Sequence, residues 1–310
     1  MTFFSRAHTA FKVTGQGPLK VLLLHALTGG PDAADREGAK GWWAPLFKAG
    51  APLSEDAVTV WTPNLLGSCY GSTGPDGLED FPELTTRDQA QVLAAWIRKA
   101  DLRFDVMIGG SLGGMVALEL ALLEPDRFKA IGVIGCGAKS HAWLWGINEI
   151  QRAILKSARL PDAEALALAR RAGMLTFRTP ESLDERFHTA PELRSWLAFH
   201  GAALAGRFTR KSYLALLDAM DSHDLSRDRG SLAEALAGLR APLFILGMDP
   251  DLMFPRAVTE EFAGAAKTAG VRCVVDWIDS IHGHDSFLIE WKQVEAWVNQ
   301  VLREGVSCAS

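Results

Sequence analysis

Short apolar segments alternate with stretches of helical periodicity along most of the chain. Helical patterns cover Arg87–Lys99 and Leu112–Leu123, and the apolar residues between Trp291 and Leu302 share one face of a last helix. This alternation is typical of βαβ units and predicts an α/β fold with a mostly parallel sheet. The segments that predict its buried strands are Leu19–Leu27, Ala57–Asn64, Phe104–Gly110, Lys129–Gly137, Ala241–Asp249 and Val271–Asp279.

The middle of the chain differs from both flanks. From about residue 140 to about residue 225 no strand pattern appears, and segments rich in Ala, Leu and Arg, such as Asp162–Phe177, predict helices. A helical insertion between two strands predicts a cap over one end of the sheet. In α/β folds, active or binding sites usually lie near such long insertions. We predict a core of residues 1–139 and 226–310, covered by a helical cap, or lid, of residues 140–225.

Composition narrows the class of protein. The 310 residues are 48% hydrophobic and carry a formal net charge of −5, which allows one sizeable core and argues against nucleic acid as a partner. The longest apolar runs are far too short to cross a membrane, and the first residues lack a convincing export signal. Four scattered cysteines without a C-x-x-C pair argue against structural zinc and a disulfide framework. We expect a soluble, cytoplasmic protein. The cysteines are Cys69, Cys136, Cys273 and Cys308.

A serine stands among four glycines between a predicted strand and a predicted helix. The segment Gly109–Gly113 satisfies G-x-S-x-G, with Ser111 at its centre. A strand that turns sharply into a helix crowds the backbone, and glycine removes the Cβ atoms that would clash. The pattern favours Ser111 as an exposed nucleophile near the positive end of a helix. The alternative is a serine that only caps the helix.

A serine nucleophile needs a base and an acid that orients the base, and both should follow later strands in the order acid, then histidine. At the end of the predicted strand Ala241–Asp249 stand Asp249 and Asp251, and after the predicted strand Val271–Asp279 stand His282 and His284. Taken separately, the aspartates are equally typical of a turn and the histidines of a surface. An acid and a histidine both occur after Ser111 in the expected order, each at the end of a predicted strand. Together they favour a catalytic triad.

Two backbone amides should stabilise the negative charge that develops during attack on a carbonyl. Leu112, directly after the nucleophile, supplies one, and Leu27 in the loop after the first buried strand is the candidate for the other. We expect His25 to brace this loop rather than to act as a second base.

Taken together, several segments resemble the homoserine O-acyltransferases, over nearly the whole chain. This resemblance implies an α/β-hydrolase fold with a helical lid, and usually a homodimer joined through lid helices. It implies transfer of an acyl group from acyl-coenzyme A to the hydroxyl of L-homoserine, a step towards methionine. It also places the triad on Ser111, Asp251 and His284, with Asp251 preferred to Asp249 because the family's acid precedes a run like "LMFP". The segments are His25–Gly30, Pro63–Pro75, Gly109–Glu119, Ile147–Ile154 and Gly283–Glu290, with two more in the cap.

The resemblance further implies that charged residues hold the amino acid. Asp285 would bind its ammonium group, and Arg170 would bind its carboxylate as a forked pair. Arg171 is an immediate competitor, and Asp285 could equally cap the last helix. Phe177 stands where the family commonly has tyrosine, which leaves strict homoserine specificity open, and Tyr70 replaces a lysine of the family.

The acyl group and the acceptor have alternatives. The resemblance to the family favours acetyl as the acyl group. A succinyl donor would need a cation in the acyl pocket, and the sequence does not show where such a cation would lie. Serine O-acyltransferases of the same family, and an esterase or thioesterase on the same fold, would use the same triad, and a non-catalytic binding protein would leave it idle. No metal and no cofactor beyond acyl-coenzyme A as co-substrate is expected.

Overall fold

The computed structural model describes residues 6–307 and contains a seven-stranded sheet with the strand order β1-β3-β2-β4-β5-β6-β7. Only β1 is antiparallel to its neighbour within this sheet, because the pairs from β3 to β7 are all parallel. The predicted α/β fold with a mostly parallel sheet is therefore confirmed. The strands are β1 Phe11–Thr14, β2 Leu19–Leu24, β3 Val58–Pro63, β4 Phe104–Gly110, β5 Phe128–Ile134, β6 Leu243–Asp249 and β7 Cys273–Asp279.

The edge strand β1 was not predicted from the sequence. Its residues Phe11 and Val13 are about half exposed, so the strand lacks the continuous buried run that marks the central strands. The central strands β2, β4 and β5 are almost wholly buried beyond their first residues. Sequence patterns therefore indicate the buried centre of the sheet more strongly than its edge.

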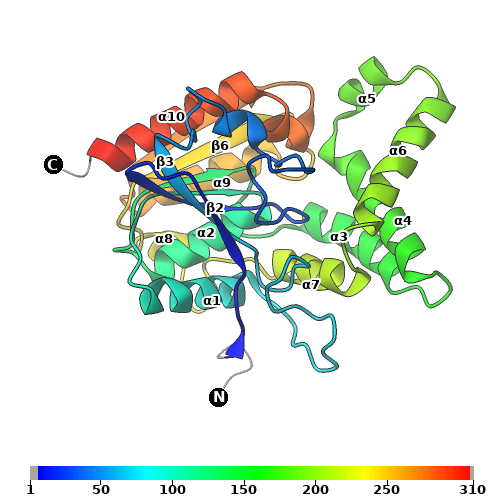
Figure 1. Cartoon of the computed structure of the whole chain (residues 1–310), viewed down its shortest axis with the longest axis horizontal. Helices are drawn as coiled ribbons and strands as arrows, with labels where there is room; N and C mark the ends of the chain where they lie inside the picture. Colours follow the sequence, from blue (N-terminus) through cyan, green and yellow to red (C-terminus); the bar gives the residue numbers. More distant parts are fainter. Residues whose placement is uncertain (1–5, 308–310) are drawn as a thin grey trace.

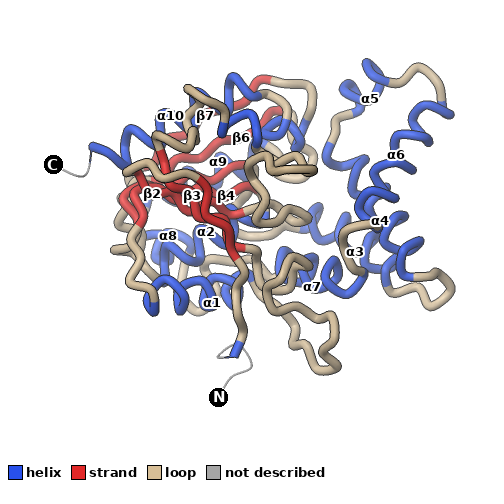
Figure 2. Tube along the Cα trace, in the orientation of Figure 1, coloured by secondary structure: helices blue, strands red, loops and turns tan. Residues whose placement is uncertain are grey.

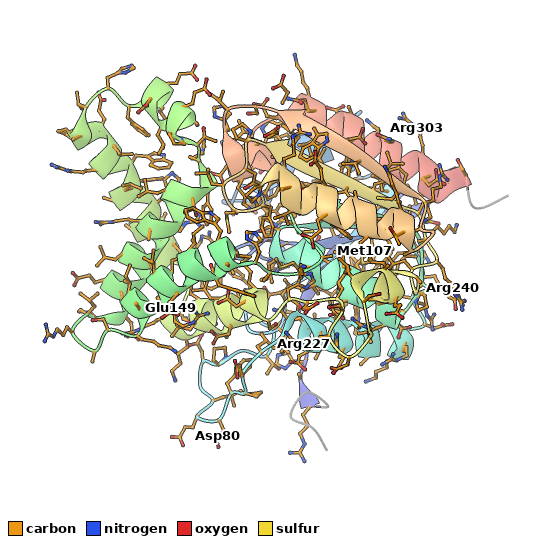
Figure 3. All side chains as sticks on the ribbon, turned by 180° about the vertical axis from the view of Figure 1, so that it is seen from behind. Asp80, Met107, Glu149, Arg227, Arg240 and Arg303 are labelled. Carbon is orange, nitrogen blue, oxygen red and sulfur yellow. The ribbon has the colours of Figure 1, made fainter. Side chains whose placement is uncertain are left out.

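Helices cover both faces of the sheet (Figure 1). Helices α1, α2 and α9 contribute to one apolar cluster, and α10 with the short helix η2 contributes to another on the opposite face. Met107 of β4 lies in the interior, while Arg240 and Arg303 point outward at the periphery (Figure 3). The helices are α1 Thr86–Lys99, α2 Leu112–Leu123, α8 Leu232–Leu236, α9 Arg256–Thr268, α10 Trp291–Ser307 and η2 Ala44–Phe47.

The segment between β5 and β6 contains most of the remaining helices and forms a group beside the sheet, without strands of its own (Figure 2). A backbone bridge between Lys139 and Asp224 joins the two ends of this segment where it leaves and rejoins the core. These helices occupy the range predicted for a cap, although the domain division 1–139, 140–225 and 226–310 itself stays a prediction. They are α3 Ala142–Leu155, α4 Asp162–Phe177, α5 Pro180–Arg186, α6 Ala190–Ala205 and α7 Arg210–Asp221.

Two further expectations concern the chain as a whole. Within residues 6–307, no helix combines the length and the apolar character that a membrane crossing requires. Of the four cysteines, Cys308 lies outside the described residues, as do the first five residues of the chain, and Cys69, Cys136 and Cys273 are free thiols.

Candidate active site

Ser111 occupies a sharp turn between β4 and α2. Its backbone has φ 53° and ψ −121°, an unfavourable conformation for a residue with a side chain. A Cβ on Gly109 would lie 2.3 Å from the carbonyl oxygen of Gly113, and one on Gly113 would lie 2.3 Å from that of Leu24. Glycine is therefore required at both positions for the turn to close. Ser111 makes no capping hydrogen bond to α2, so its side chain is free for another role.

His284 and Asp251 complete a hydrogen-bonded chain that begins at Ser111. The Nε2 atom of His284 lies 3.0 Å from Ser111 Oγ, and its Nδ1 atom lies 2.8 Å from Asp251 Oδ2. The backbone amides of Met253 and Phe254 donate to the other carboxylate oxygen of Asp251 at 2.7 and 3.1 Å. Asp251 is thereby fixed with one oxygen aimed at the imidazole. The structure thus brings together the three side chains predicted as a triad, with the mutual geometry that nucleophilic catalysis needs.

The surroundings of His284 favour its role as a base. Burial opposes a charged imidazole, but the charge and hydrogen bond of Asp251, with a further contribution from Asp285, outweigh that effect and raise the pKa of His284 above its ordinary value. A higher pKa strengthens the imidazole as an acceptor for the proton of Ser111. Ser111, Asp251 and His284 are all at most 5% exposed, so bulk water screens these interactions little.

The alternative acid, Asp249, and the alternative base, His282, have other partners. Asp249 Oδ2 accepts a hydrogen bond from Arg256 Nε at 2.7 Å, on the exposed end of β6. His282 Nδ1 lies 2.9 Å from Ser182 Oγ in the cap and makes no contact with Ser111 within the described residues. Geometry therefore selects Asp251 and His284 from the two pairs that the sequence offered.

The two candidate oxyanion amides are buried beside the nucleophile. Leu27 lines the same pocket as Ser111, and Leu112 follows Ser111 at the start of α2. Within residues 6–307, neither amide donates to a backbone acceptor, so both have capacity for a ligand oxygen. That they form the oxyanion hole remains a prediction, as does every catalytic role assigned to these residues.

His25 links the loop that contains Leu27 to the loop that follows β3. Its Nδ1 lies 2.8 Å from the carbonyl oxygen of Ala26, and its Nε2 accepts a hydrogen bond from the amide of Leu65 at 3.0 Å. These contacts require a neutral ring with the proton on Nδ1. Burial lowers the pKa of His25 to about 4, which keeps the ring neutral at physiological pH. The geometry agrees with the expected bracing role.

Ser111 and His284 open into a small pocket of about 70 Å³ between the core and the cap. The predicted substrate-binding residues Arg170 and Asp285 both line it. The guanidinium of Arg170 lies 4.9 Å from the centre of the Phe177 ring, on the same helix α4. Arg171, the competing arginine, does not line this pocket. The pocket is otherwise mainly apolar, with walls that include Leu27, Met220, Met253, Phe287 and Leu288.

Sequence reasoning missed Arg178, which lies one residue beyond α4. Its Nε donates to Asp285 Oδ2 at 3.0 Å, and both side chains are less than one-fifth exposed. This ion pair joins the cap to the loop of His284. The only sequence signal is its position directly after Phe177, and the carboxylate partner is more than 100 residues away along the chain. A substrate ammonium group would share Asp285 with Arg178.

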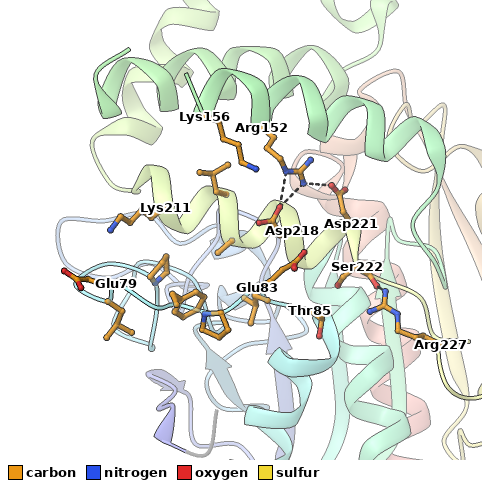
Figure 4. Close-up of a pocket in the computed structure, with 17 residues that line it drawn as sticks. Glu79, Glu83, Thr85, Arg152, Lys156, Lys211, Asp218, Asp221, Ser222 and Arg227 are labelled. Atoms are coloured by element: carbon orange, nitrogen blue, oxygen red, sulfur yellow. Dashed lines mark hydrogen bonds and ion pairs between the residues drawn. The ribbon is translucent and has the colours of Figure 1, made fainter. Parts of the chain in front are cut away.

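A hollow of about 1030 Å³ lies farther from the nucleophile, between the cap and the loop before α1 (Figure 4). Lys156 and Lys211 lie on the cap side, and Glu79 and Glu83 on the opposite loop. Arg152, also on the cap side, is held by ion pairs to carboxylates of α7. None of the triad residues lines this hollow, and its mixed charges favour no class of ligand.

Comparison with known proteins agrees with this geometry. The family model described as "Alpha/beta hydrolase family" matches residues 21–296. A homoserine O-acetyltransferase of Thermus thermophilus is 41% identical over 313 residues, covering 91% of this chain and 81% of that protein. The crystal structure of a homoserine O-acetyltransferase from Staphylococcus aureus superposes with a TM-score of 0.83 at 26% identity, covering 96% of this chain and 89% of that one. An acetylester hydrolase from Corynebacterium glutamicum has a TM-score of 0.80 at 16% identity, covering 97% of both chains, which shows a shared fold.

The fold and the serine-centred site define this protein as an α/β hydrolase in the structural sense, with a helical insertion over the site. Within that large class the sequence relatives are more specific. The chain belongs to the homoserine O-acetyltransferase family.

Proposed function

We propose that this protein transfers an acetyl group from acetyl-coenzyme A to the hydroxyl of L-homoserine through an acetyl-serine intermediate on Ser111. The observation that carries the proposal is the 3.0 Å contact between His284 Nε2 and Ser111 Oγ, in a chain of the homoserine O-acetyltransferase family. The product, O-acetylhomoserine, would serve methionine biosynthesis.

In the first half-reaction, Ser111 Oγ attacks the thioester carbonyl and His284 takes its proton. Asp251 stabilises the imidazolium that forms, and the amides of Leu27 and Leu112 hold the oxyanion. The C–S bond then breaks, and His284 returns the proton to the coenzyme A thiolate. Nucleophile, base and oxyanion donors are all supplied by the chain, so the proposed reaction needs no metal and no further cofactor.

In the second half-reaction, homoserine enters with its carboxylate at Arg170 and its ammonium at Asp285. His284 removes the proton of the substrate hydroxyl, which attacks the acetyl-serine ester, and the proton returns to Ser111 Oγ as the product leaves. Water could carry out the same attack. Burial of the triad and positioning by Arg170 and Asp285 favour the amino acid over water.

The pocket beside Ser111 supports acetyl rather than succinyl as the acyl group. Its walls near Ser111 include the apolar side chains of Met220 and Met253, which suit an uncharged acyl group. Among the described residues that line it, Arg170 alone carries a permanent positive charge, and that charge is needed for the carboxylate of the acceptor. A succinyl carboxylate would compete with homoserine for it.

Initial rates at varied concentrations of both substrates test the mechanism. Because coenzyme A leaves before homoserine enters, reciprocal plots should give parallel lines, and intersecting lines would contradict the acetyl-serine pathway. A fluorophosphonate probe should label Ser111, whereas absence of labelling would favour a non-catalytic binding protein.

An esterase or thioesterase is the second candidate, favoured by the close fold similarity to an acetylester hydrolase. Release of coenzyme A should be strongly stimulated by L-homoserine if the protein is a transferase, and unaffected by it if the protein is a hydrolase. Including L-serine and succinyl-coenzyme A in the same assay tests the alternative acceptor and donor.

We also propose a homodimer in the cytoplasm, joined through the cap. The cap exposes large apolar side chains, with Ile150 on α3 60% exposed and Phe199 on α6 67% exposed. Large apolar side chains exposed on the cap favour contact with another protein surface. Light scattering should give the mass of a dimer, and Ile150→Glu with Phe199→Glu should reduce it to that of a monomer. A dimer that persists in this variant would place the interface elsewhere.

A further inference from the structure

A second hollow adjoins the catalytic pocket, and we call it the outer channel. It has a volume of about 500 Å³ and shares with the catalytic pocket the wall residues Ala26, Thr28, Arg170, Phe287 and Leu288. It reaches the exposed side chains of Arg36 and Lys40, in the segment between β2 and η2. The two hollows therefore share a wall. Together they extend from the exposed side chains of Arg36 and Lys40 to the surroundings of Ser111.

The charge of the outer channel is opposite in sign to that of the protein. The chain carries a formal net charge of −5. By contrast, the channel is lined by the cations Arg36, Lys40, Arg170 and Arg207 and by one carboxylate, Asp32. Asp32 is already paired with Lys12, and its contact with Arg36 Nε is 3.2 Å. Lys40 makes no ion pair within residues 6–307. The channel therefore offers positive charge to an anionic ligand.

Aromatic side chains form walls of the outer channel and are held in place by the backbone. Trp42 Nε1 donates to the carbonyl oxygen of Gly30 at 2.9 Å. The ring of Tyr70 packs so closely on Gly30 that a Cβ at this glycine would lie 2.6 Å from it. Between the two cations, the amide of Arg36 donates to the carbonyl of Ala39 at 3.0 Å. Trp42 and Tyr70 therefore both lie against Gly30 in the wall of the channel.

We propose that the outer channel binds the phosphate-bearing carrier of the acyl donor, with Arg36 and Lys40 contacting its phosphates and Trp42 and Tyr70 packing along its uncharged arm. This proposal rests on the proposed function, which requires a coenzyme A thioester. The pocket that Ser111 and His284 line is small, about 70 Å³, so most of a coenzyme A thioester must extend beyond it. The walls close to Ser111 are mainly apolar apart from Arg170, which the proposed function assigns to the acceptor, and Arg36 and Lys40 lie at the exposed end. This order matches that of coenzyme A, whose phosphates lie far from its thiol.

Arg207 joins this channel to the oxyanion loop. It lies between α6 and α7, and its Nη1 donates to the carbonyl oxygen of Thr28 at 2.7 Å and to the hydroxyl of Tyr70. Thr28 follows Leu27, so a substitution of Arg207 would disturb both donor binding and the position of an oxyanion amide. We assign Arg207 as a positioning residue, and the test below leaves it intact.

The test compares Arg36→Ala, Lys40→Ala and the double variant, each as the full chain, with acetyl-coenzyme A and with 4-nitrophenyl acetate, which has an acetyl group but no phosphates. Each single change should raise the KM for acetyl-coenzyme A by about fivefold, the upper end for an exposed ion pair, and the double change by about 25-fold. The matched controls Lys48→Ala and Arg303→Ala remove exposed cations outside the channel and should leave both KM values unchanged.

The decisive quantity is the ratio of kcat/KM for the two donors. A fall in this ratio that weakens as salt is added supports phosphate binding in the channel. Equal losses for both donors, or no change in the KM for acetyl-coenzyme A, overturn it. A larger effect of Lys156→Ala with Lys211→Ala would also overturn it by placing the donor in the hollow of Figure 4. If homoserine fails as acceptor while coenzyme A release shows the predicted ratio, the proposed acceptor is wrong and the donor site stands.

Discussion

The core and the cap contribute to one pocket in different ways. In the core, Ser111, Asp251 and His284 follow the carboxyl ends of parallel strands, and backbone geometry or amide hydrogen bonds fix them. In the cap, Arg170 and Phe177 share the helix α4, where the guanidinium lies over the ring of Phe177 and also interacts with the hydroxyl of Tyr213 on α7. We therefore propose that the core supplies the chemistry, whereas the cap contributes Arg170 to selection of the acceptor. Changes in the core should abolish the reaction, and changes in the cap should redirect it.

The largest effect is expected from Ser111→Ala, which removes the nucleophile. The variant should lose transfer activity by about 10⁴-fold or more, because the remaining amides and histidine cannot form the acyl intermediate. Thermal unfolding should change little, since Ser111 Oγ contributes one hydrogen bond. The control Ser54→Ala removes a hydroxyl outside the pocket. A transfer activity above about 1% of that of the wild type would mean that the reaction does not proceed through an acyl intermediate on Ser111.

A cap substitution should act on acceptor binding instead. Arg170→Lys keeps the charge but loses the forked geometry, and we expect the KM for homoserine to rise about tenfold, with Arg170→Ala giving about 100-fold. Hydrolysis of 4-nitrophenyl acetate should change much less. Arg171→Lys is the matched control, because this neighbouring arginine does not line the pocket. If Arg171→Lys has the larger effect, the carboxylate site is assigned to the wrong arginine.

The same contrast explains what the sequence could predict. The strands and the G-x-S-x-G turn were predictable because close backbone packing at Gly109 and Gly113 leaves a local signature. The ion pair of Arg178 with Asp285 joins residues 107 positions apart, and nothing local marks it. The choice of Asp251 over Asp249 also needed the structure or the family pattern, since Asp249 is the last residue of β6 and Asp251 follows it by only two positions. Local sequence patterns therefore do not predict the contacts between the core and the cap.

Asp285 lies where core and cap meet, and its charge helps to raise the pKa of His284. In the proposed mechanism His284 must be neutral to act as a base, so activity should fall as pH drops below its pKa. Asp285→Asn removes the negative charge and lowers that pKa, and the acid limb of the pH profile should therefore move to lower pH. The profile is measured as kcat/KM for 4-nitrophenyl acetate, which needs no acceptor.

At neutral pH the same variant should raise the KM for homoserine by about tenfold, through loss of a charge-assisted contact to the ammonium group. Asp279→Asn, at the exposed end of β7, is the control. An acid limb that stays in place in Asp285→Asn would show that Asp251 alone sets the pKa of His284.

The smallest effect is expected from Phe177→Tyr, which restores the residue common in the family. A methyl group on Gly173 would lie 3.2 Å from Phe177 Cζ and 2.9 Å from Gln151 Oε1, so these two atoms flank the same space. We expect a hydroxyl on Cζ to lie near Gln151 Oε1, which can accept its hydrogen bond. We therefore expect the preference for homoserine over serine to change by less than about threefold. Phe199→Tyr, on the exposed face of α6, controls for an added hydroxyl in the cap. A rise of about tenfold, or more, in Phe177→Tyr alone would show that the hydroxyl reaches the acceptor and that Phe177 broadens specificity.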